Sequence, residues 1–566
     1  MLLVFLGLAA LLLGPIWTSP TTRTLGAGTG DPGMFAWFLR WTPFAVGRQI
    51  SPFFSDYLNH PDGINLMWNT WIPLPGLLLS PLTLTFGPVM TFNVLLTLAY
   101  GLSAWSAYLA IHRYVPSHGA AVAGGLVYGF SPAMIAHSHH LNLILVFLLP
   151  WLLVLVDEIV VRQRRSPVWL GVALGVIAAA QVLIGEELFV GAVLLGGLLL
   201  VVLVAMHPRP AASRVRYAMT AFAVSVVVFE ALLALPLNAQ LTGPARVRSD
   251  ITEEVRGSSD LLAVVTPSRL SAIAPDAAVR FGDRFVGTKE TYLGIPLLLV
   301  VVAVVFIRRR SLVVRVGSAM LLVCMVLSLG SRLRIGGRPT FIRLPWTVVE
   351  SLPLLQNMVP SRLALFTALF AGLLLAAALE GLWRGGGWPP RALAVVTAGL
   401  VLAFLAPRAP LPSSPVATPP FFTTSAVHML PRDGVALVVP FPRKGRANQA
   451  MVWQAEAGMR FKLPGGYFVG PDPGGGVLHE APPTTTSLTL GRIQRGGRPP
   501  DLTSELRRQI AEDFARWEVG SVVLGPMRHR RVMARFLTEL LGRPPERLAG
   551  VEMWGDATVA PAIGGT

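Results

Sequence analysis

The stretch "TLGAGTGDPGMFAWFLRW" (residues 24–41) follows the first apolar segment and contains one carboxylate, Asp31, between Gly30 and Pro32. An acid directly before a proline is common at the start of a helix, where it caps free backbone N–H groups. An acid held on a rigid turn can also accept a proton from a substrate. Both roles, capping and catalysis, are compatible with this stretch taken alone.

The composition is that of a polytopic membrane protein. Of the 566 residues, 53% are hydrophobic and 14% are charged, whereas about 25% are charged in soluble domains. The formal net charge is +17. The arginines lie in short clusters between apolar runs, which favours topology signals and contacts with lipid phosphates over nucleic-acid binding. The single cysteine, Cys324, excludes a disulfide framework and a CxxC metal site.

About eleven apolar runs are long enough to cross the roughly 30 Å hydrocarbon core of a bilayer. They cover residues 1–17, 89–111, 119–136, 141–161, 167–184, 188–206, 217–236, 291–307, 312–329, 363–383 and 391–407. The first run lacks a basic start and a clear cleavage site, so we expect it to be a retained signal anchor.

The charges of the connecting loops indicate the orientation. Every second connection is short and basic, as in RQRRSP (162–167) and RRRSLVVR (308–315), whereas HSHHLN (137–142) and LIGEEL (183–188) contain no Arg or Lys. The basic connections are therefore expected in the cytoplasm, in a multi-pass protein of the plasma membrane. The outer face then receives the long loops 18–88, 237–290 and 330–362 and the tail.

The tail has a different pattern, in which strand-like and helix-like segments alternate. DGVALVVPFP (433–442) and VGSVVLGP (519–526) are typical of strands, and DLTSELRRQIAEDFARW (501–517) and RRVMARFLTELLG (530–542) of helices. The predicted fold is an all-α polytopic membrane domain followed by a small extracytoplasmic α/β domain. The predicted boundaries are 1–407 for the membrane domain, 408–430 for a Pro/Ser-rich linker and 431–566 for the α/β domain.

Unusual polar residues occur at the predicted outer face, where ionisable groups at the ends of spans commonly mark a functional site. The candidates for substrate binding or catalysis are Asp31, Asp56, Asn65, Trp68, His139, His140, Glu186, Glu187, Lys289, Tyr292 and Arg362. Arginine presents a planar fork to phosphate oxygens, so Arg362, with Lys289, is the first choice for holding a lipid phosphate. A belt of cations against lipid headgroups is the alternative.

Several of these residues have a structural alternative. Asp56 and Asp62 suit turns, as in HPDG (60–63). The histidine cluster can be a hydrated helix end instead of a metal site. The tryptophans are compatible with stacking on sugars and equally with an interfacial aromatic belt; they are Trp37, Trp41, Trp68 and Trp71. The charges in ARWE (515–518) are expected on a solvated surface.

Along residues 1 to 380 the chain resembles the GT-C superfamily of membrane glycosyltransferases, and more closely its actinobacterial members that use polyprenyl-phosphate sugars. The motifs that carry the resemblance are GDPGMFAWFLRW, PFFSDYLNHPDGINLMWNT, YGFSPAMIAHSHHLNL, GEE, KETYLGIPLLL and VPSRLALF. The resemblance implies a polyprenyl-phosphate sugar donor, with Asp31 in the position of the catalytic base and Asp56 nearest to a second acid. The family's usual pair of neighbouring acids is missing, since Asp31 has no adjacent acidic partner, and this argues against a metal requirement. No cofactor is therefore predicted, and a divalent metal stays an open alternative.

The expected activity is transfer of a sugar, with inversion, to a cell-envelope glycan, lipid or protein on the outer face of the membrane. The expected partners are the lipid-linked donor, a glycan or glycolipid acceptor and membrane lipids, with no nucleic acid. Two alternatives stay open. One is a transporter for lipid-linked sugars, which should show repeats or broken helices, and the other is a non-catalytic envelope-assembly protein with a GT-C-like fold.

Overall fold

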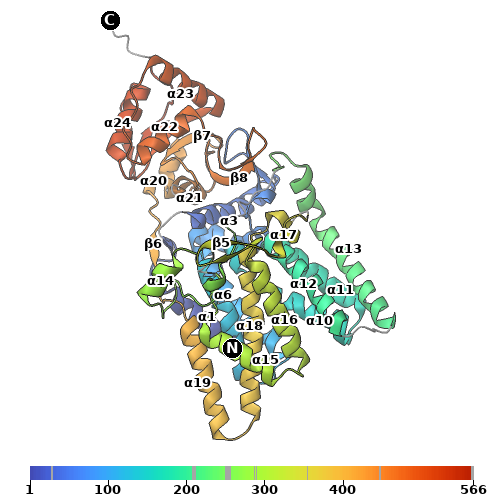
Figure 1. Cartoon of the computed structure of the whole chain (residues 1–566). Helices are drawn as coiled ribbons and strands as arrows, with labels where there is room; N and C mark the ends of the chain where they lie inside the picture. The colour runs from blue at the N-terminus through green and yellow to red at the C-terminus, as the bar shows by residue number, and fades with distance from the viewer. Residues whose placement is uncertain are drawn as a thin grey trace. The chain divides into compact units, whose positions relative to one another are not determined.

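The computed structural model describes residues 1–26, 30–206, 212–248, 257–285, 287, 290–352, 355–444 and 448–561 (Figure 1). The chain divides into two compact units, and each unit combines segments that are far apart in the sequence. Unit 1 consists of Met1–Gly14, Leu95–Ala234 and Asp250–Leu411, and unit 2 of Pro15–Val94, Leu235–Ser249 and Pro412–Thr566. The predicted domains follow the order of the sequence, whereas the compact units place the first outer loop and the tail together.

Seven helical stretches of the described residues are long and apolar enough to cross a membrane by length and composition. They are Pro88–His112 (α6), His118–Ala136 (α7 and α8), Leu141–Arg162 (α9, α10 and η2), Glu186–Met206 (α12), Arg214–Thr242 (in α13), Pro360–Arg384 (η6 and α18) and Trp388–Leu405 (α19). Four shorter apolar helices are Leu2–Leu12 (α1), Pro167–Val182 (α11), Ile295–Ile307 (α15) and Leu312–Ser328 (α16). The predicted helical membrane fold is confirmed, and the number of spans stays a prediction.

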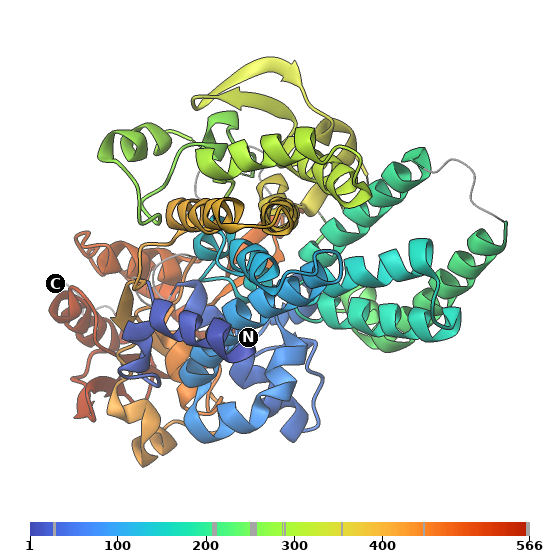
Figure 2. The same ribbon diagram turned by 90° about the horizontal axis from the view of Figure 1, so that it is seen from below.

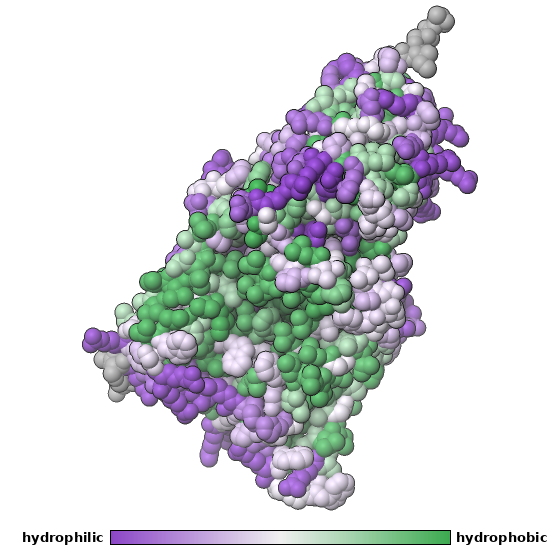
Figure 3. Space-filling view, turned by 180° about the vertical axis from the view of Figure 1, so that it is seen from behind, coloured by the Kyte–Doolittle hydropathy of each residue, from purple (hydrophilic) through white to green (hydrophobic). Residues whose placement is uncertain are grey.

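The helices of unit 1 form a bundle (Figure 1, Figure 2). Hydrophobic side chains cover a broad continuous surface in the space-filling view (Figure 3). Large apolar residues such as Leu299 and Phe306 on α15 and Val395 on α19 are exposed. An exposed apolar surface of this size is expected where lipid is the solvent.

The centre of this bundle is the contact between α7 (His118–Gly129) and α18 (Ala364–Arg384), which depends on small residues. A Cβ on Gly124 would lie 2.6 Å from the carbonyl oxygen of Gly372, and a Cβ on Gly372 would lie 2.5 Å from that of Gly124. The two backbones therefore touch. Within a membrane, the hydrophobic effect does not drive helices together. Close backbone approach lets them associate through dispersion contacts instead.

One predicted span is interrupted between α9 (Leu141–Ile144) and α10 (Leu149–Asp157). Neighbouring helices supply donors to the carbonyls that the break frees. Ser106 Oγ donates to Phe147 O (2.5 Å) and the Tyr128 hydroxyl to Val146 O (3.0 Å). A broken helix is one feature expected of a transporter. Here the protein's own side chains satisfy the freed backbone groups, which is the condition for such a break within a membrane.

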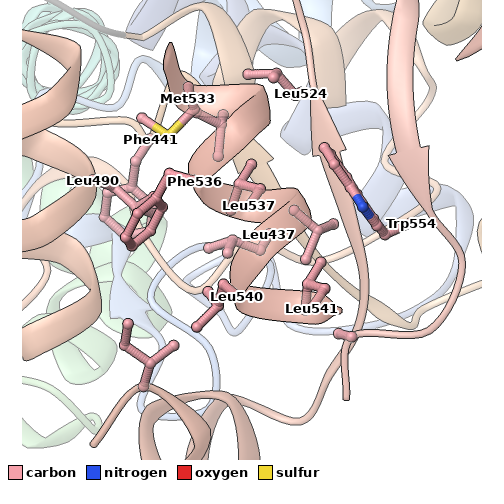
Figure 4. Packing of buried hydrophobic residues seen from close by; sticks show 14 of the residues in the cluster. Leu437, Phe441, Leu490, Leu524, Met533, Phe536, Leu537, Leu540, Leu541 and Trp554 are labelled. Atoms are coloured by element: carbon pink, nitrogen blue, oxygen red, sulfur yellow. The ribbon is translucent and has the colours of Figure 1, made fainter. Parts of the chain in front are cut away.

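Unit 2 contains a four-stranded sheet in the order β11-β12-β10-β7. The strands are β7 (Val435–Val439), β10 (Val519–Leu524), β11 (Glu546–Leu548) and β12 (Val551–Trp554), with β7 parallel to β10 and the other pairs antiparallel. The helices α22 (Thr485–Gln494), α23 (Ser504–Trp517) and α24 (Arg530–Leu541) belong to the same region. Leu437, Leu537 and Trp554 point toward one another between sheet and helices (Figure 4). The predicted alternation of strands and helices is present, and its status as a separate domain stays a prediction.

The predicted first outer loop contributes a second part of unit 2. It contains α3 (Asp31–Gly47), α4 (Pro73–Leu78) and α5 (Ser80–Phe86), and α3 packs against α21 (Gln449–Glu456) of the tail. Three two-stranded sheets accompany these helices: β1 (Arg23–Leu25) with β6 (Ser413–Pro415), β2 (Phe54–Ser55) with β3 (Ile64–Asn65), and β8 (Tyr467–Pro471) with β9 (Val477–Glu480). Residues that the sequence separates by about 400 positions are thus direct neighbours.

The remaining short elements lie between those already described. They are α2 (Gly14–Trp17), η1 (Leu66–Trp68), η4 (Leu261–Val264), α14 (Asp276–Gly282), β4 (Arg332–Ile335), β5 (Arg338–Arg343), α17 (Trp346–Val349), η5 (Leu355–Asn357), α20 (Pro420–Thr423) and η7 (Ser425–Met429). Strands β4 and β5 form a hairpin that carries four of the arginines of the third outer loop.

Candidate active site

Asp31 is the first residue of α3, and Gly30 occupies the cap position before it. A carboxylate in the first turn is favoured by the partial positive charge of the helix amino end. The hydroxyl of Tyr467 on β8 donates a hydrogen bond to the Asp31 carboxylate. Burial raises the pKa of Tyr467, and the charge of Asp31 raises it further, so this hydroxyl stays protonated. Asn448 Nδ2 also donates to the carbonyl of Gly30 (3.2 Å). The tail therefore contacts both the acid and the residue directly before it.

The tryptophans of α3 form its buried support. Trp37 stacks on Trp41 with centroids 5.5 Å apart, and both are at most 1% exposed. Trp37 Nε1 donates to Gln454 Oε1 (2.5 Å), Trp41 Nε1 to Pro52 O (2.9 Å), and Trp71 Nε1 to Thr42 Oγ1 (3.0 Å). Sugar stacking and an interfacial belt are both wrong for Trp37, Trp41 and Trp71, because their rings and N–H groups are used inside the protein.

Asp56 lies in the same loop and is already paired. Its Oδ2 lies 2.6 Å from Lys462 Nζ and 3.7 Å from His60 Nδ1. Lys462 also lies over the ring of Tyr57, 5.7 Å from its centroid. The Asp56 side chain is 37% exposed, so it remains accessible to solvent, and its catalytic role stays a prediction.

Asn65 and Trp68, two predicted substrate-binding residues, make hydrogen bonds within unit 2. Asn65 Oδ1 accepts from Met67 N (3.0 Å), and its Nδ2 donates to Ala239 O (2.9 Å) and Pro244 O (3.0 Å). Trp68 is half-buried and donates through Nε1 to the carbonyl of residue 240 (2.9 Å). These bonds fix the loop, and substrate contacts by either side chain stay predictions.

A second polar group lies in unit 1, where Glu187 in the first turn of α12 forms an ion pair with Arg362 of η6 (Pro360–Leu363). Glu187 Oε1 also accepts from Val359 N (2.8 Å). His137 Nε2 lies 3.7 Å from Glu290 Oε1. Burial lowers the pKa of His137 well below its usual range, and the positive charge of Arg362 lowers it further. This imidazole is therefore neutral.

The remaining predicted residues of unit 1 are distributed around this group. Tyr292 is 3% exposed and lines a small cavity with Glu290. Glu186 is next to Glu187 in the first turn of α12, and His139 and His140 follow α8 (Pro132–Ala136). Lys289 lies outside the described residues. Within the described ranges, no group of three or more His, Cys, Asp or Glu side chains could hold a metal ion.

A family model described as "Domain of unknown function (DUF6311)" matches residues 3–402. The chain belongs to this family. No curated protein matches the chain. The DUF6311 chain is similar to arabinofuranosyltransferase AftD from Mycobacteria, with a TM-score of 0.56 and 16% identity over 98% of this chain and 40% of AftD. It is also similar to the apo oligosaccharyltransferase of Archaeoglobus fulgidus (TM-score 0.50, 11% identity, 92% of this chain and 69% of that one).

A third similar structure is ArnT from Cupriavidus metallidurans bound to undecaprenyl phosphate (TM-score 0.49, 12% identity, 97% of both chains). The DUF6311 chain spans about two fifths of the length of AftD. AftD and the Archaeoglobus fulgidus oligosaccharyltransferase are GT-C glycosyltransferases, so the resemblance inferred from the sequence is confirmed for the fold. The orientation of the tail outside the membrane stays a prediction.

Sequence reasoning missed the tail residues that hold the first outer loop. Tyr467, Asn448 and Lys462 contact this loop from positions about 400 residues away. It also missed Glu290, although the acid stands within the quoted motif KETYLGIPLLL. Glu290 stands two residues before the predicted residue Tyr292, and this was the one signal in the sequence that could have identified it.

Proposed function

We propose that this DUF6311 chain transfers a sugar from a polyprenyl-phosphate carrier to a glycan, lipid or protein acceptor on the outer face of the membrane, with inversion. The observation that carries the proposal is the acid at the start of α3, in the first loop after the first apolar helix of a GT-C fold. Tyr467 donates to this acid, and Asn448 donates to the carbonyl of Gly30 directly before it, so both contacts favour a fixed position. A rigid base is what in-line proton removal requires.

In the proposed reaction Asp31 removes the proton of the acceptor hydroxyl while its oxygen attacks the anomeric carbon of the donor sugar. The bond from that carbon to the phosphate oxygen breaks, and the polyprenyl phosphate leaves with the electron pair. The leaving phosphate carries its own negative charge and needs a cation more than an acid. Tyr467 keeps Asp31 oriented as a positioning residue.

Arg362 is the proposed cation for the donor phosphate. Its contact with Glu187 uses Nη1, and a guanidinium has two further nitrogens that can donate. Glu187 would then orient the guanidinium instead of competing for it. The proposed role of Asp56 is that of a second catalytic acid, and Lys289 would hold the donor phosphate together with Arg362. The other proposed substrate-binding residues are His139, His140, Glu186, Tyr292, Asn65 and Trp68.

The test uses membranes that contain the full-length protein and a panel of tritium-labelled polyprenyl-phosphate hexoses and pentoses. We expect Asp31→Asn to lower transfer about 10²–10⁴-fold, the usual contribution of a general base, while donor binding is retained. Asp62→Asn is the matched control, because Asp62 is an exposed acid of the same loop that pairs with Arg516 at 2.9 Å. Unchanged transfer by the Asp31 variant would exclude this residue as the base.

A further inference from the structure

Unit 2 contains a cavity of about 800 Å³ that the sequence did not suggest. It lies where the parallel strands β7 and β10 end, since Pro440 follows β7 and Met527 to His529 follow β10. Ligands commonly bind beyond the carboxyl ends of parallel strands, because the loops there diverge. The volume is within the range of small-molecule sites, roughly 300–1,000 Å³.

Basic side chains dominate the wall of this cavity. The charged lining residues and the histidine are Arg443, Lys444, Arg495, Arg528, His529 and Glu480. Four are permanent cations and one is an acid, so the wall carries an excess of positive charge. A concave surface of one sign attracts and concentrates ions of the opposite sign.

The single acid of this wall, Glu480, forms an ion pair with Arg443. Glu480 accepts from Arg443 through Nε (3.2 Å) and Nη2 (2.7 Å), and from the backbone N–H of Lys444 (3.0 Å). Burial opposes the ionised form, but these hydrogen bonds lower the pKa of Glu480. Arg443 is thereby neutralised. For the side chains of Lys444, Arg495 and Arg528, the described part of the chain contributes no ion pair.

The wall around these cations is fixed and also offers neutral groups. Gln494 accepts from Phe441 N (3.1 Å) and donates to Phe441 O (3.2 Å), which holds the segment after β7. Gln449 lines the cavity, and its buried Oε1 has no hydrogen-bond partner among the described residues. An amide oxygen of this kind accepts from a hydroxyl group. The cavity thus combines cations for an anion with an acceptor for a sugar hydroxyl.

Two connections within unit 2 join this wall to Asp31. Asn448, which donates to the Gly30 carbonyl, directly precedes Gln449 in the chain. Tyr467, which donates to Asp31, pairs with Glu480 across β8 and β9. The candidate base and the basic cavity are therefore supported by the same two segments.

We propose that this cavity binds the acceptor through an anionic group, so that the acceptor is a saccharide that carries a phosphate or a carboxylate. This inference rests on the proposed function, because it takes the bound saccharide to be the acceptor of the sugar transfer. Lys444, Arg495 and Arg528 form no ion pair within the described residues, so they favour an anion over a neutral sugar. Arginine forks suit both oxyanions, so the shared chemistry is a negatively charged oxygen group on a sugar.

The test measures binding to the full-length protein in detergent by isothermal titration calorimetry, with glucose 1-phosphate, glucuronic acid and glucose as probes. We expect at least one anionic probe to bind more tightly than glucose. Arg495→Glu and Arg528→Glu should each weaken that binding about ten- to a hundredfold, as for loss of a charge-assisted hydrogen bond. Arg535→Glu on the exposed face of α24 makes the same change in net charge outside the cavity and should leave binding unchanged.

The probes distinguish the two oxyanions. Binding of glucose 1-phosphate alone would identify a phosphate-bearing sugar, and binding of glucuronic acid alone a carboxylate-bearing sugar. Equal affinity for glucose, or unchanged binding by the Arg495 and Arg528 variants, would overturn the proposal. Binding requires no turnover, so Asp31→Asn should retain it, and a failure of the transferase assay would leave this measurement intact.

Discussion

The arginine pairs of unit 1 that involve Arg362, Arg113 and Arg384 differ from the cations that line the cavity of unit 2. In unit 1, Arg362 pairs with Glu187, Arg113 with Glu158 and Arg384 with Glu380. In unit 2, the cavity keeps Lys444, Arg495 and Arg528 together around one acid that Arg443 already occupies. A cation among apolar helices needs a fixed counterion, because leaving it unpaired costs several kcal/mol. A cation that faces water is solvated, so it can stay unpaired until an anionic ligand binds.

The largest expected effect comes from breaking a pair in unit 1. Arg362→Gln removes the partner of Glu187, whose side chain is 18% exposed, and we expect a loss of up to about 3–5 kcal/mol in the free energy of unfolding. The measurement is an SDS titration followed by circular dichroism. The double variant Arg362→Gln/Glu187→Gln should recover most of the loss, since no charge is then left alone. A single variant as stable as the wild type would show that this pair contributes nothing.

The second effect concerns Glu456, a largely buried acid of unit 2 that lies near Arg40. Burial raises the pKa of Glu456 to about 7, although the charge of Arg40 opposes the shift. The unfolded pKa is about 4.3. Because the folded state holds this proton more tightly, its contribution is complete below the unfolded pKa and is lost as the pH rises toward 7. We expect this group to make the protein less stable at pH 8 than at pH 4, by up to about 3 kcal/mol.

Thermal unfolding of the detergent-solubilised protein across this pH range checks the direction. Glu456→Gln should remove the fall in stability between pH 4 and pH 7. Glu512→Gln, an exposed acid on α23, should keep it. A wild-type protein that becomes more stable over this interval, with Glu456→Gln unchanged from it, would contradict the assignment.

The smallest expected effect is in the cavity. Arg528→Gln removes a cation with like-charged neighbours and no counterion, so we expect the free energy of unfolding to change by about 0.5 kcal/mol or less. The same SDS titration measures it. A loss as large as that of Arg362→Gln would mean that the cavity cations are structural, and the contrast between the units would disappear.

Local patterns were sufficient to predict the helical membrane fold and the strands of the tail. An apolar run or an alternating segment shows its structure within about twenty residues, as at 363–383 and 519–526. Glu187 and Arg362 were both predicted as functional residues for the same reason, since an ionisable group at the end of a span is conspicuous. Their ion pair was not predicted, because nothing in either segment indicates the other.

The surroundings of Asp31 could not be predicted in this way. Tyr467 and Asn448 belong to no recognisable motif, and only the folded chain brings them to α3. The charges of ARWE (515–518) were expected on a solvated surface, and Arg516 and Glu518 are indeed 57% and 74% exposed. Their partners were not predicted: Arg516 pairs with Asp62 at 2.9 Å, and Glu518 lies 3.4 Å from His60. The tryptophans after Asp31 are buried because α21 covers them, which a membrane-protein composition does not suggest.

The pairing of β1 with β6 has a consequence for biosynthesis. Arg23 and Ser413 hydrogen-bond across a sequence separation of 390 residues. At a synthesis rate of roughly 5–20 residues per second, the second strand emerges about 20–80 seconds after the first. During that delay the apolar side of α3 has no α21 to cover it. The α3 segment therefore lacks its packing partner until the tail has been synthesised.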